Sequence, residues 1–500
     1  AALDHDIKGK TTTFEAEHKE CIRVLPYTNA SGQVYVQLYV FCDKNSIPEE
    51  LKEAAQEFFG ETGVELRWTN LYNYASNIPN IVSKDFKQLE VSQANVICKI
   101  INKNLPVFSK HRNITAIQPS LKVTNSKQTN YPCIRVYVLG KGCIPVGESE
   151  IPNAVENCPV DIVDGFWLET IDTPKPLTAH KQEKYLRLGA SIGVRGAKTA
   201  GTLGAIVKDD SSFYLLSCDH VINHEWEREI IHPGGGHYLA SLKYHLTEYQ
   251  NWINRIIEPE NSWMDSNLMP KSIFEHLKNQ VNSFYNATDV QRHPKLEECE
   301  RKLGELFSEK PRTVAYYKDG FRQNMKIPGG SECFIDVAIA ELTDKEVEAL
   351  KEKGYVEIID TTNYPDGNVS RDGSQNRAKE WCKSGSSTGY TTLKNHYYLE
   401  NVFLKTAEHE RPSFFPGNLK PPETYVGDEV WRVSCLLFPH NQNVFSKLGD
   451  SGAVIFEKSE GQPQAMSGFG IVLGVISSEA GCGTVAAPLF SALDLLYEKL

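Results

Sequence analysis

Gly449-Asp450-Ser451-Gly452 places a serine between glycines in a sequence typical of a tight turn. A turn of this kind can present the Ser451 hydroxyl clear of other side chains, while the flanking backbone N–H groups point at one spot. Two such donors stabilise the oxyanion that forms when a nucleophile attacks a carbonyl. The same tetrapeptide also makes an ordinary surface turn, so nucleophilic catalysis at Ser451 requires a base and a buried acid elsewhere in the chain.

A histidine and an aspartate in suitable surroundings precede this serine. His220 lies within residues 213–222, where an apolar, strand-like run ends in polar residues, so it is predicted where a strand gives way to a loop. Asp336 lies within an apolar run at residues 333–342, where an ionised carboxylate is costly unless it has a partner. The N–H of a catalytic histidine would be such a partner. The order His220, Asp336, Ser451 therefore predicts a catalytic triad.

With this order of residues, the chain resembles the trypsin-like serine peptidases of the chymotrypsin fold. It looks like an intracellular or bacterial branch of them, to which the plant narrow-leaf-type proteases are similar. The matching segments over residues 186–500 are 190–193, 199–207, 231–236, 239–242, 383–392, 444–448, 473–478 and 483–489, followed by a helix expected at 490–499. The resemblance implies a mainly β fold of two six-stranded antiparallel β-barrels, with a strand at residues 239–242.

The resemblance also implies a mechanism. His220 would take the proton from Ser451 as the hydroxyl attacks a peptide carbonyl, and would return it to the leaving amine. Asp336 would orient His220, and the backbone N–H groups of Gly449 and Ser451 would hold the oxyanion. The expected activity is that of a serine endopeptidase acting on protein or peptide substrates.

The pocket for the residue before the cleaved bond is assigned by the same resemblance. Its expected lining is Phe445, Ser446, Lys447, Ser477, Ser478 and Glu479. No acid falls at the expected floor, near Phe445 or Ser446, so a small or apolar substrate residue is favoured over lysine or arginine. Glu479 stands where relatives often keep a glycine. It would narrow the pocket, attract a cation at its mouth, or simply be solvated.

Asp450 bears on activation. In secreted zymogens of the family, the matching aspartate pairs with a newly cleaved N-terminus. No basic cleavage site followed by an Ile-Val-Gly-Gly-like sequence precedes Ala190. We therefore expect control by a partner or by a local rearrangement instead of propeptide cleavage.

Composition restricts the class of protein. The 500 residues carry a formal net charge of −11, which makes nucleic acid or an anionic membrane a poor partner. The chain has no run of 18 or more apolar residues, so we expect no membrane span. The 12 cysteines form no Cys-x-x-Cys pair, and several lie inside apolar strand patterns, where a free thiol acts as a small hydrophobe. These patterns favour reduced thiols and a cytoplasmic location.

Residues 1–185 have the pattern of a separate α+β module. The expected elements are strands at 34–41, 64–68, 134–138 and 160–163, a helix that residues 46–49 open and Gly60 stops, and a second helix at 83–104. Two strand–helix–strand units indicate a duplication. Because the region carries no catalytic motif, we expect a regulatory or assembly role.

A long stretch separates His220 from Asp336. Residues 272–285 and 294–308 carry apolar residues at three- and four-residue steps, which predicts a helical insertion at about residues 245–311. Such an excursion is either a lid or docking surface, or a passive elaboration. His232 and His237 flank a run of glycines before it, but two histidines on one loop are more often structural, so we expect no metal and no cofactor.

Two functions from different classes remain open. The first is an intracellular serine endopeptidase controlled by its N-terminal module, an activating partner or homo-oligomerisation. The alternative is an interaction protein that keeps the protease fold with weak or no turnover. The complete set of His220, Asp336 and Ser451 favours the first.

Overall fold

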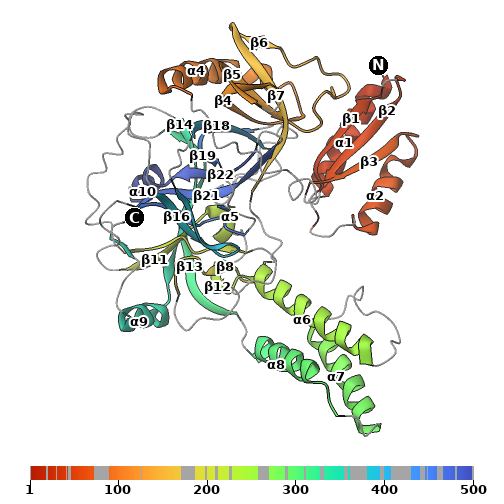
Figure 1. The fold of residues 1–500 in the computed structure, drawn as a ribbon, viewed down its shortest axis with the longest axis vertical. Coiled ribbons are helices and arrows are strands. Elements are labelled where there is room, and N and C mark those ends of the chain that lie inside the picture. Colours follow the sequence, from red (N-terminus) through yellow and green to blue (C-terminus); the bar gives the residue numbers. More distant parts are fainter. Residues whose placement is uncertain are drawn as a thin grey trace, which may run out of the picture.

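The structure, a computed structural model, describes residues 1–500 with the exception of 1, 19–20, 30, 41, 43–46, 72–88, 125–126, 170–185, 198–199, 209–211, 224–227, 257–269, 288–290, 309–310, 327–331, 354–357, 361–379, 395–398, 407–429, 440–444, 447–448, 459–465, 479–480 and 498–500. Strands hold more of the described residues than helices, so the fold is mainly β, as predicted. Figure 1 shows two large sheets, a small N-terminal sheet and a projecting group of helices.

The N-terminal part of the chain forms a small α+β unit. Its elements are α1 (Ala2–Glu17), β1 (Cys21–Thr28), β2 (Val34–Val40), α2 (Glu49–Gly60) and β3 (Glu65–Asn70). β2 and β3 run parallel because α2 connects them on one face of the sheet. The helix predicted to end at Gly60 is confirmed, and it begins at Glu49 after Pro48, without a side-chain cap. The two helices bury Phe14, Leu51 and Phe59 against Val36 of β2.

An eight-stranded sheet forms a half-barrel from residues after 190. Its order is β15 (Ile358–Asp360), β10 (Ala205–Lys208), β11 (Phe213–Ser217), β14 (Glu332–Leu342), β13 (Arg312–Lys326), β12 (Glu229–His232), β8 (Ser191–Val194) and β9 (Gly201–Thr202). β11 and most of β14 are buried along their length, which explains their continuous apolar sequences.

An eleven-stranded sheet holds the second core. Its order is β17 (Gly389–Lys394), β16 (Glu380–Gly385), β20 (Val454–Lys458), β21 (Met466–Ser478), β22 (Gly481–Pro488), β19 (Val430–Pro439), β18 (Leu399–Thr406), β4 (Ile114–Thr124), β5 (Lys127–Val138), β7 (Cys158–Glu169) and β6 (Ala154–Val155). A further pairing of β21 with β7 closes seven of these strands into a barrel.

The barrel closure differs from the expected arrangement of two six-stranded barrels within residues 186–500. β4 pairs with β18 and β7 pairs with β21, so hydrogen-bonded strands cross the expected boundary at residues 185–186. β4, β5 and β7 therefore contribute to the same barrel as the C-terminal strands. The helix expected at 83–104 is α4 (Val91–Phe108), which packs on the barrel around Ile101, Phe108 and Ile117.

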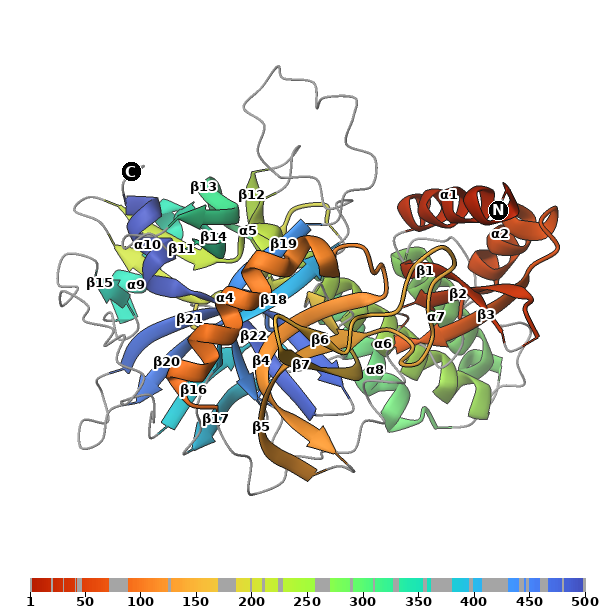
Figure 2. The same cartoon turned by 90° about the horizontal axis from the view of Figure 1, so that it is seen from above.

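Three helices lie between β12 and β13. They are α6 (Gly235–Ile256), α7 (Pro270–Ala287) and α8 (Pro294–Ser308), and they surround a core of their own that includes Leu246, Tyr249, Phe274 and Leu303. Figures 1 and 2 show them projecting away from the half-barrel. The strand expected at 239–242 is wrong, because these residues belong to α6, whose buried positions recur at helical spacing.

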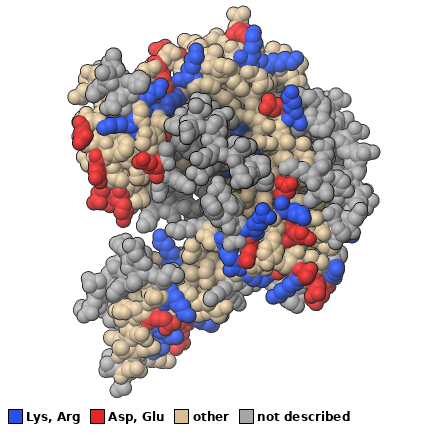
Figure 3. All heavy atoms as spheres, turned by 180° about the vertical axis from the view of Figure 1, so that it is seen from behind, with Lys and Arg blue, Asp and Glu red and all other residues tan. Residues whose placement is uncertain are grey.

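Shorter helices complete the described chain: α5 (Asp219–Ile222), α9 (Asp344–Lys353) and α10 (Leu489–Tyr497). α10 confirms the helix predicted at the C-terminal end. None of the described helices combines the length and apolarity needed to cross a bilayer. On the face shown in Figure 3, acidic and basic side chains are interspersed over the described residues.

Candidate active site

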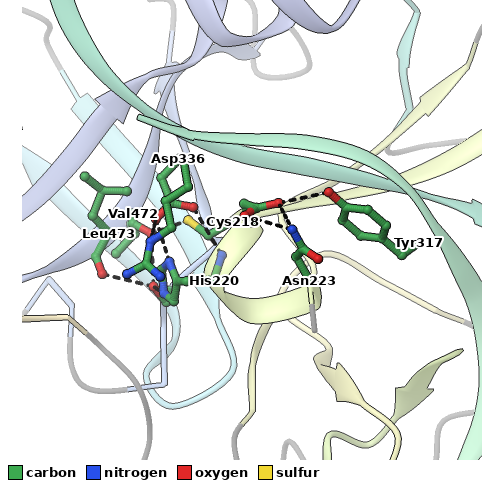
Figure 4. Close-up of polar contacts among 10 residues, drawn as sticks. Cys218, His220, Asn223, Tyr317, Asp336, Val472 and Leu473 are labelled. Atoms are coloured by element: carbon green, nitrogen blue, oxygen red, sulfur yellow. Dashed lines mark hydrogen bonds and ion pairs between the residues drawn. The ribbon is translucent and has the colours of Figure 1, made fainter. Parts of the chain in front are cut away.

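The two large sheets bring the predicted triad together. His220 lies in α5, directly after β11, and Asp336 lies in the middle of β14, the neighbour of β11 in the half-barrel. Ser451 lies in the turn before β20, in the other sheet. The site is therefore formed between the sheets (Figure 4).

The distances match a Ser-His-Asp relay of hydrogen bonds. His220 Nδ1 lies 2.7 Å from Asp336 Oδ2, and His220 Nε2 lies 2.6 Å from Ser451 Oγ. The backbone N–H of His220 also donates to Asp336 Oδ1 at 3.3 Å. With the Nδ1 proton directed at the carboxylate, Nε2 is left to accept the proton of the serine hydroxyl.

Asp336 has a second charged neighbour that the sequence did not indicate. Arg322 is its register partner on β13, and Arg322 Nε lies 3.6 Å from Asp336 Oδ2. Asp336 has no exposed surface, so an unpaired charge there would be strongly unfavourable. The guanidinium and the imidazole both lie against this buried carboxylate.

The turn that carries His220 is held by the neighbouring carboxylate of Asp219. Asp219 Oδ1 accepts hydrogen bonds from Tyr317 Oη at 3.1 Å and from Asn223 Nδ2 at 3.0 Å (Figure 4). Burial, together with the charge of Asp219, raises the pKa of Tyr317, so this phenol stays a donor. A Cβ on Gly320 would lie 2.3 Å from Asp219 Oδ1, so only glycine fits beside this carboxylate. These contacts fix the direction in which α5 presents His220.

The Ser451 turn has the conformation that its glycines predict. Gly449 and Gly452 adopt φ values of +90° and +89°, which side chains of L-residues rarely allow. The Gly449 carbonyl accepts hydrogen bonds from Thr202 Oγ1 at 2.9 Å and from Ser386 Oγ. Among the described residues, no acceptor is bonded to the N–H of Gly449 or of Ser451, so both donors are available for an oxyanion.

Asp450, between these two residues, is part of a buried ion pair. Its Oδ2 accepts from Lys383 Nζ at 2.8 Å and from Thr388 Oγ1 at 2.6 Å, and its Oδ1 accepts from the backbone N–H of Ser387 at 3.0 Å. Neither charged side chain has exposed surface. A Cβ on Gly385 would lie 2.1 Å from Asp450 Oδ1, so a glycine is required there.

Lys383 therefore supplies an internal ammonium group next to the Ser451 turn. Burial lowers the pKa of Lys383, and the charge of Asp450 opposes this effect. The segment at 383–392 was recognised in the sequence, but nothing in it identified Lys383 as the partner of Asp450. That pairing depends on β16 lying beside β20, which is a tertiary fact.

The described residues of the expected substrate pocket are all buried. Phe445 packs in the core with Trp381 and Phe438, and Ser446 is 2% exposed. Thr391 Oγ1 donates to the Phe445 carbonyl at 2.9 Å. Phe445 is thus a core residue in this conformation.

The remaining expected pocket residues lie on β21 or just beyond it. Ser477 and Ser478 are buried and pair with Phe166 and Gly165 of β7, so they contact the chain itself. Lys447 and Glu479 lie outside the described residues. The roles of all six residues in substrate binding remain predictions.

The triad is enclosed. Ser451 and Asp336 have no exposed surface, and the side chain of His220 is 2% exposed. A substrate of any size therefore requires that covering groups move away. The burial also removes water, which strengthens the electrostatic interactions within the triad.

Residue types that bind metals occur together once in the part of the chain that the structure describes, at Cys218, His220 and Asp336. Two of the three are the triad pair, already bonded to each other, and Cys218 Sγ lies 3.2 Å from the Val472 carbonyl oxygen. His232 and His237 both bond to Ser191 of β8, through its carbonyl and its hydroxyl respectively. Both histidines thus contact the first strand of the half-barrel.

Comparison of the chain with models of known families gives no match, and comparison with curated proteins gives none either.

Proposed function

We propose that this protein is a serine endopeptidase with a chymotrypsin-like arrangement of its site. The observation that carries the proposal is the continuous set of contacts from Asp336 through His220 to Ser451, at 2.7 and 2.6 Å. A nucleophile bonded to a base, itself bonded to a buried acid, is the arrangement that activates a serine hydroxyl. The resemblance of residues 186–500 to trypsin-like peptidases supports the same reaction.

The reaction follows from the positions of the groups. As Ser451 Oγ attacks a peptide carbonyl, His220 Nε2 takes the hydroxyl proton, and Asp336 stabilises the imidazolium that forms. The backbone N–H groups of Gly449 and Ser451 donate to the oxyanion of the tetrahedral intermediate. His220 then gives the proton to the leaving amine. Water repeats the sequence on the acyl-enzyme and releases the new carboxylate.

Ion pairing at Asp450 supports a turn that is already shaped for this reaction. Lys383 provides the cation that a cleaved N-terminus provides in secreted zymogens, so the turn needs no proteolytic activation. The enclosed triad instead supports control by movement of covering segments, through the N-terminal unit, a partner or a second copy of the chain.

A small fluorophosphonate probe, which reacts with activated serines, tests the proposal. We expect the full chain to be labelled at Ser451, and Ser451→Ala and His220→Ala to abolish the labelling. Ser308→Ala, at an exposed serine of α8, is the matched control and should leave labelling unchanged. Folded protein that stays unlabelled at Ser451 under all conditions, including variants with loosened covering segments, would exclude the peptidase.

The second candidate function is a protease-fold interaction protein with weak or no turnover. The complete burial of Ser451 favours it, because a substrate cannot reach a nucleophile with no exposed surface. The two candidates differ in whether the enclosure is permanent. Labelling that appears only after a covering segment is displaced assigns the protein to the peptidases.

A further inference from the structure

One edge of β21 leads directly to Ser451. β20 pairs with residues 466–471 of this strand, and β22 covers the opposite edge at residues 470–478. Beyond β20, the serine turn continues along the first edge, with the Gly452 N–H donating to the Val472 carbonyl at 2.9 Å. Ser451 Oγ then lies 3.0 Å from the Leu473 carbonyl oxygen.

The next position on that edge is taken by β7. Glu169 pairs with Gly474, and residues 165–168 pair in register with residues 475–478, all antiparallel. β22 occupies the other edge of the same residues, so β7 must share the edge used by β20 and the serine turn. The C-terminal end of β7 therefore points along β21 toward the residue that contacts Ser451.

An extended peptide whose carbonyl is to be attacked at Ser451 needs this same edge. Added strands bind through main-chain hydrogen bonds to an exposed sheet edge, with alternate side chains in pockets. β7 already makes these main-chain pairings at residues 474–478, and it has the direction that brings the carboxyl side of a peptide to the nucleophile.

Resting on the proposed peptidase function, we infer that residues 165–169 are a resident, substrate-like strand that excludes peptide substrates from the edge of β21. A peptide must displace this segment before it can pair beside Ser451. The regulated step is therefore the release of β7, and the triad itself is already assembled.

Three contacts anchor the resident strand. A Cβ on Gly165 would lie 2.6 Å from Ser478 Cβ, so the two strands approach more closely there than any other residue would allow. The Gly165 carbonyl accepts a hydrogen bond from Thr115 Oγ1 at 3.0 Å. Trp167 Nε1 donates to the Lys405 carbonyl at 3.0 Å.

Phe166 connects the resident strand to the N-terminal unit. Its side chain is 1% exposed and packs in a cluster with Tyr27, Tyr35 and Tyr39 of the three-stranded sheet. Displacing that sheet would remove one wall of the Phe166 pocket. The N-terminal unit is thereby placed to control access to the site, which gives its expected regulatory role a physical route.

Two substitutions weaken the packing of residues 165–169 of β7 without changing a residue of the triad. Phe166→Ala removes the contact with the N-terminal sheet, and Gly165→Ala forces a methyl group against Ser478. We expect either change to raise the turnover of a fluorogenic peptide about tenfold or more, since a free strand edge is gained. Phe307→Ala and Gly304→Ala, both on α8, are matched controls, and a Cβ on Gly304 would meet nothing within 4 Å.

A reversible disulfide between β7 and β21 tests the inference in the opposite direction, because it prevents the release of β7. Leu168→Cys and Val475→Cys in one chain place two thiols on directly opposed residues of β7 and β21. After oxidation, with the cross-link confirmed by mass, we expect peptide turnover to be lost, and a reductant to restore it. Wild-type protein treated identically controls for oxidation of its native thiols.

The outcomes separate this inference from the proposed function. Fluorophosphonate labelling at Ser451, with peptide turnover unaffected by both loosening and locking of β7, overturns the inference and leaves the peptidase standing. Absence of labelling in folded wild-type protein and in both loosened variants overturns the peptidase, and the inference with it. Increased turnover on loosening and loss of turnover on locking support both.

Discussion

The two large sheets contribute different parts of the site and are completed in different ways. The half-barrel supplies His220 and Asp336 and uses only strands from the chain after residue 190. The closed barrel supplies Ser451 and needs β4, β5 and β7 from the first third of the chain. The half-barrel thus positions His220 and Asp336 with strands of its own, while the barrel that carries Ser451 includes strands from the N-terminal region.

Each sheet also buries a carboxylate close to Ser451, and the two carboxylates have different partners. Asp336 Oδ2 lies 2.7 Å from His220 Nδ1 and 3.6 Å from Arg322 Nε, so the closer partner of this carboxylate is the imidazole. Asp450 instead receives Lys383 Nζ at 2.8 Å and is neutralised where it lies. One carboxylate acts on a neighbouring group, and the other fixes the shape of a turn.

The largest effect on activity is expected from a substitution in the half-barrel. Asp336→Asn keeps the size of the side chain but favours the wrong imidazole tautomer, so kcat should fall about 10⁴-fold, as in comparable triads. Steady-state cleavage of a peptide by a β7-loosened variant, with and without the substitution, measures this. Arg322→Gln should cost much less, because it leaves the contacts of His220 with Asp336 and with Ser451 in place. Equal losses in both variants would contradict the assigned roles.

On the barrel side, Lys383→Met should destabilise the protein. Removing one partner of a buried ion pair leaves an uncompensated charge, which costs about 3–5 kcal/mol. Denaturant unfolding of the variant gives the change in the free energy of unfolding. Adding Asp450→Asn should recover part of the loss, because the unpaired charge disappears. A double variant no more stable than Lys383→Met would show that the charge is not the cause.

The same pair predicts how activity depends on pH. Burial lowers the pKa of Lys383, so its ammonium loses the proton below the ordinary titration range of lysine. Below the folded-state pKa the ion pair is intact, and above it Asp450 has lost its cation, so activity should fall as the pH rises through that value. Lys383→Arg keeps the charge, since guanidinium does not titrate there, and should move the alkaline limb upward. Identical alkaline limbs of kcat/KM in both proteins would rule out Lys383 as the titrating group.

The smallest effect is expected from the projecting helices. His232 and Arg312 are register partners on β12 and β13, so a short connection can replace residues 242–308. Loop closure costs only about 0.6 kcal/mol for each doubling of length, and the helices bury a separate core. A Gly/Ser linker there should leave fluorophosphonate labelling of Ser451 within about threefold of wild type, while changing the use of protein substrates. An unfolded product would instead make α6–α8 part of the half-barrel core.

The triad could be predicted from the sequence because each member carries a local signature. Ser451 lies in a turn flanked by glycines, His220 follows an apolar run, and Asp336 lies inside a second apolar run. Each of these patterns is contained within about ten residues of sequence. The roles of Lys383 and Arg322 could not, because each depends on which strand lies alongside. The strand expected at residues 239–242 came from the resemblance alone. The buried residues of α6 recur at helical spacing, which local periodicity could have indicated.

The fold was predicted less completely than the site. Single elements such as α2, β2 and α10 follow from their own periodicity. The pairing of Glu169 with Gly474 joins residues far apart in the chain, and no local pattern encodes it. Three strands of the region expected to be an α+β module pair into one barrel with C-terminal strands, and their local sequence does not indicate this.

The joining of β7 to β21 has a consequence for biosynthesis. A nascent chain that has emerged only as far as β7 has no β18 and no β21, so the outer edges of β4 and β7 stay unpaired until the C-terminal strands are made. Pairings between such distant residues form slowly, and the unpaired strand edges stay exposed and prone to aggregation until they form. The same delay means that the serine turn, the edge beside it and the strand covering that edge all come together last. Ser451 and the strand beside it can therefore meet only after β21 has been made.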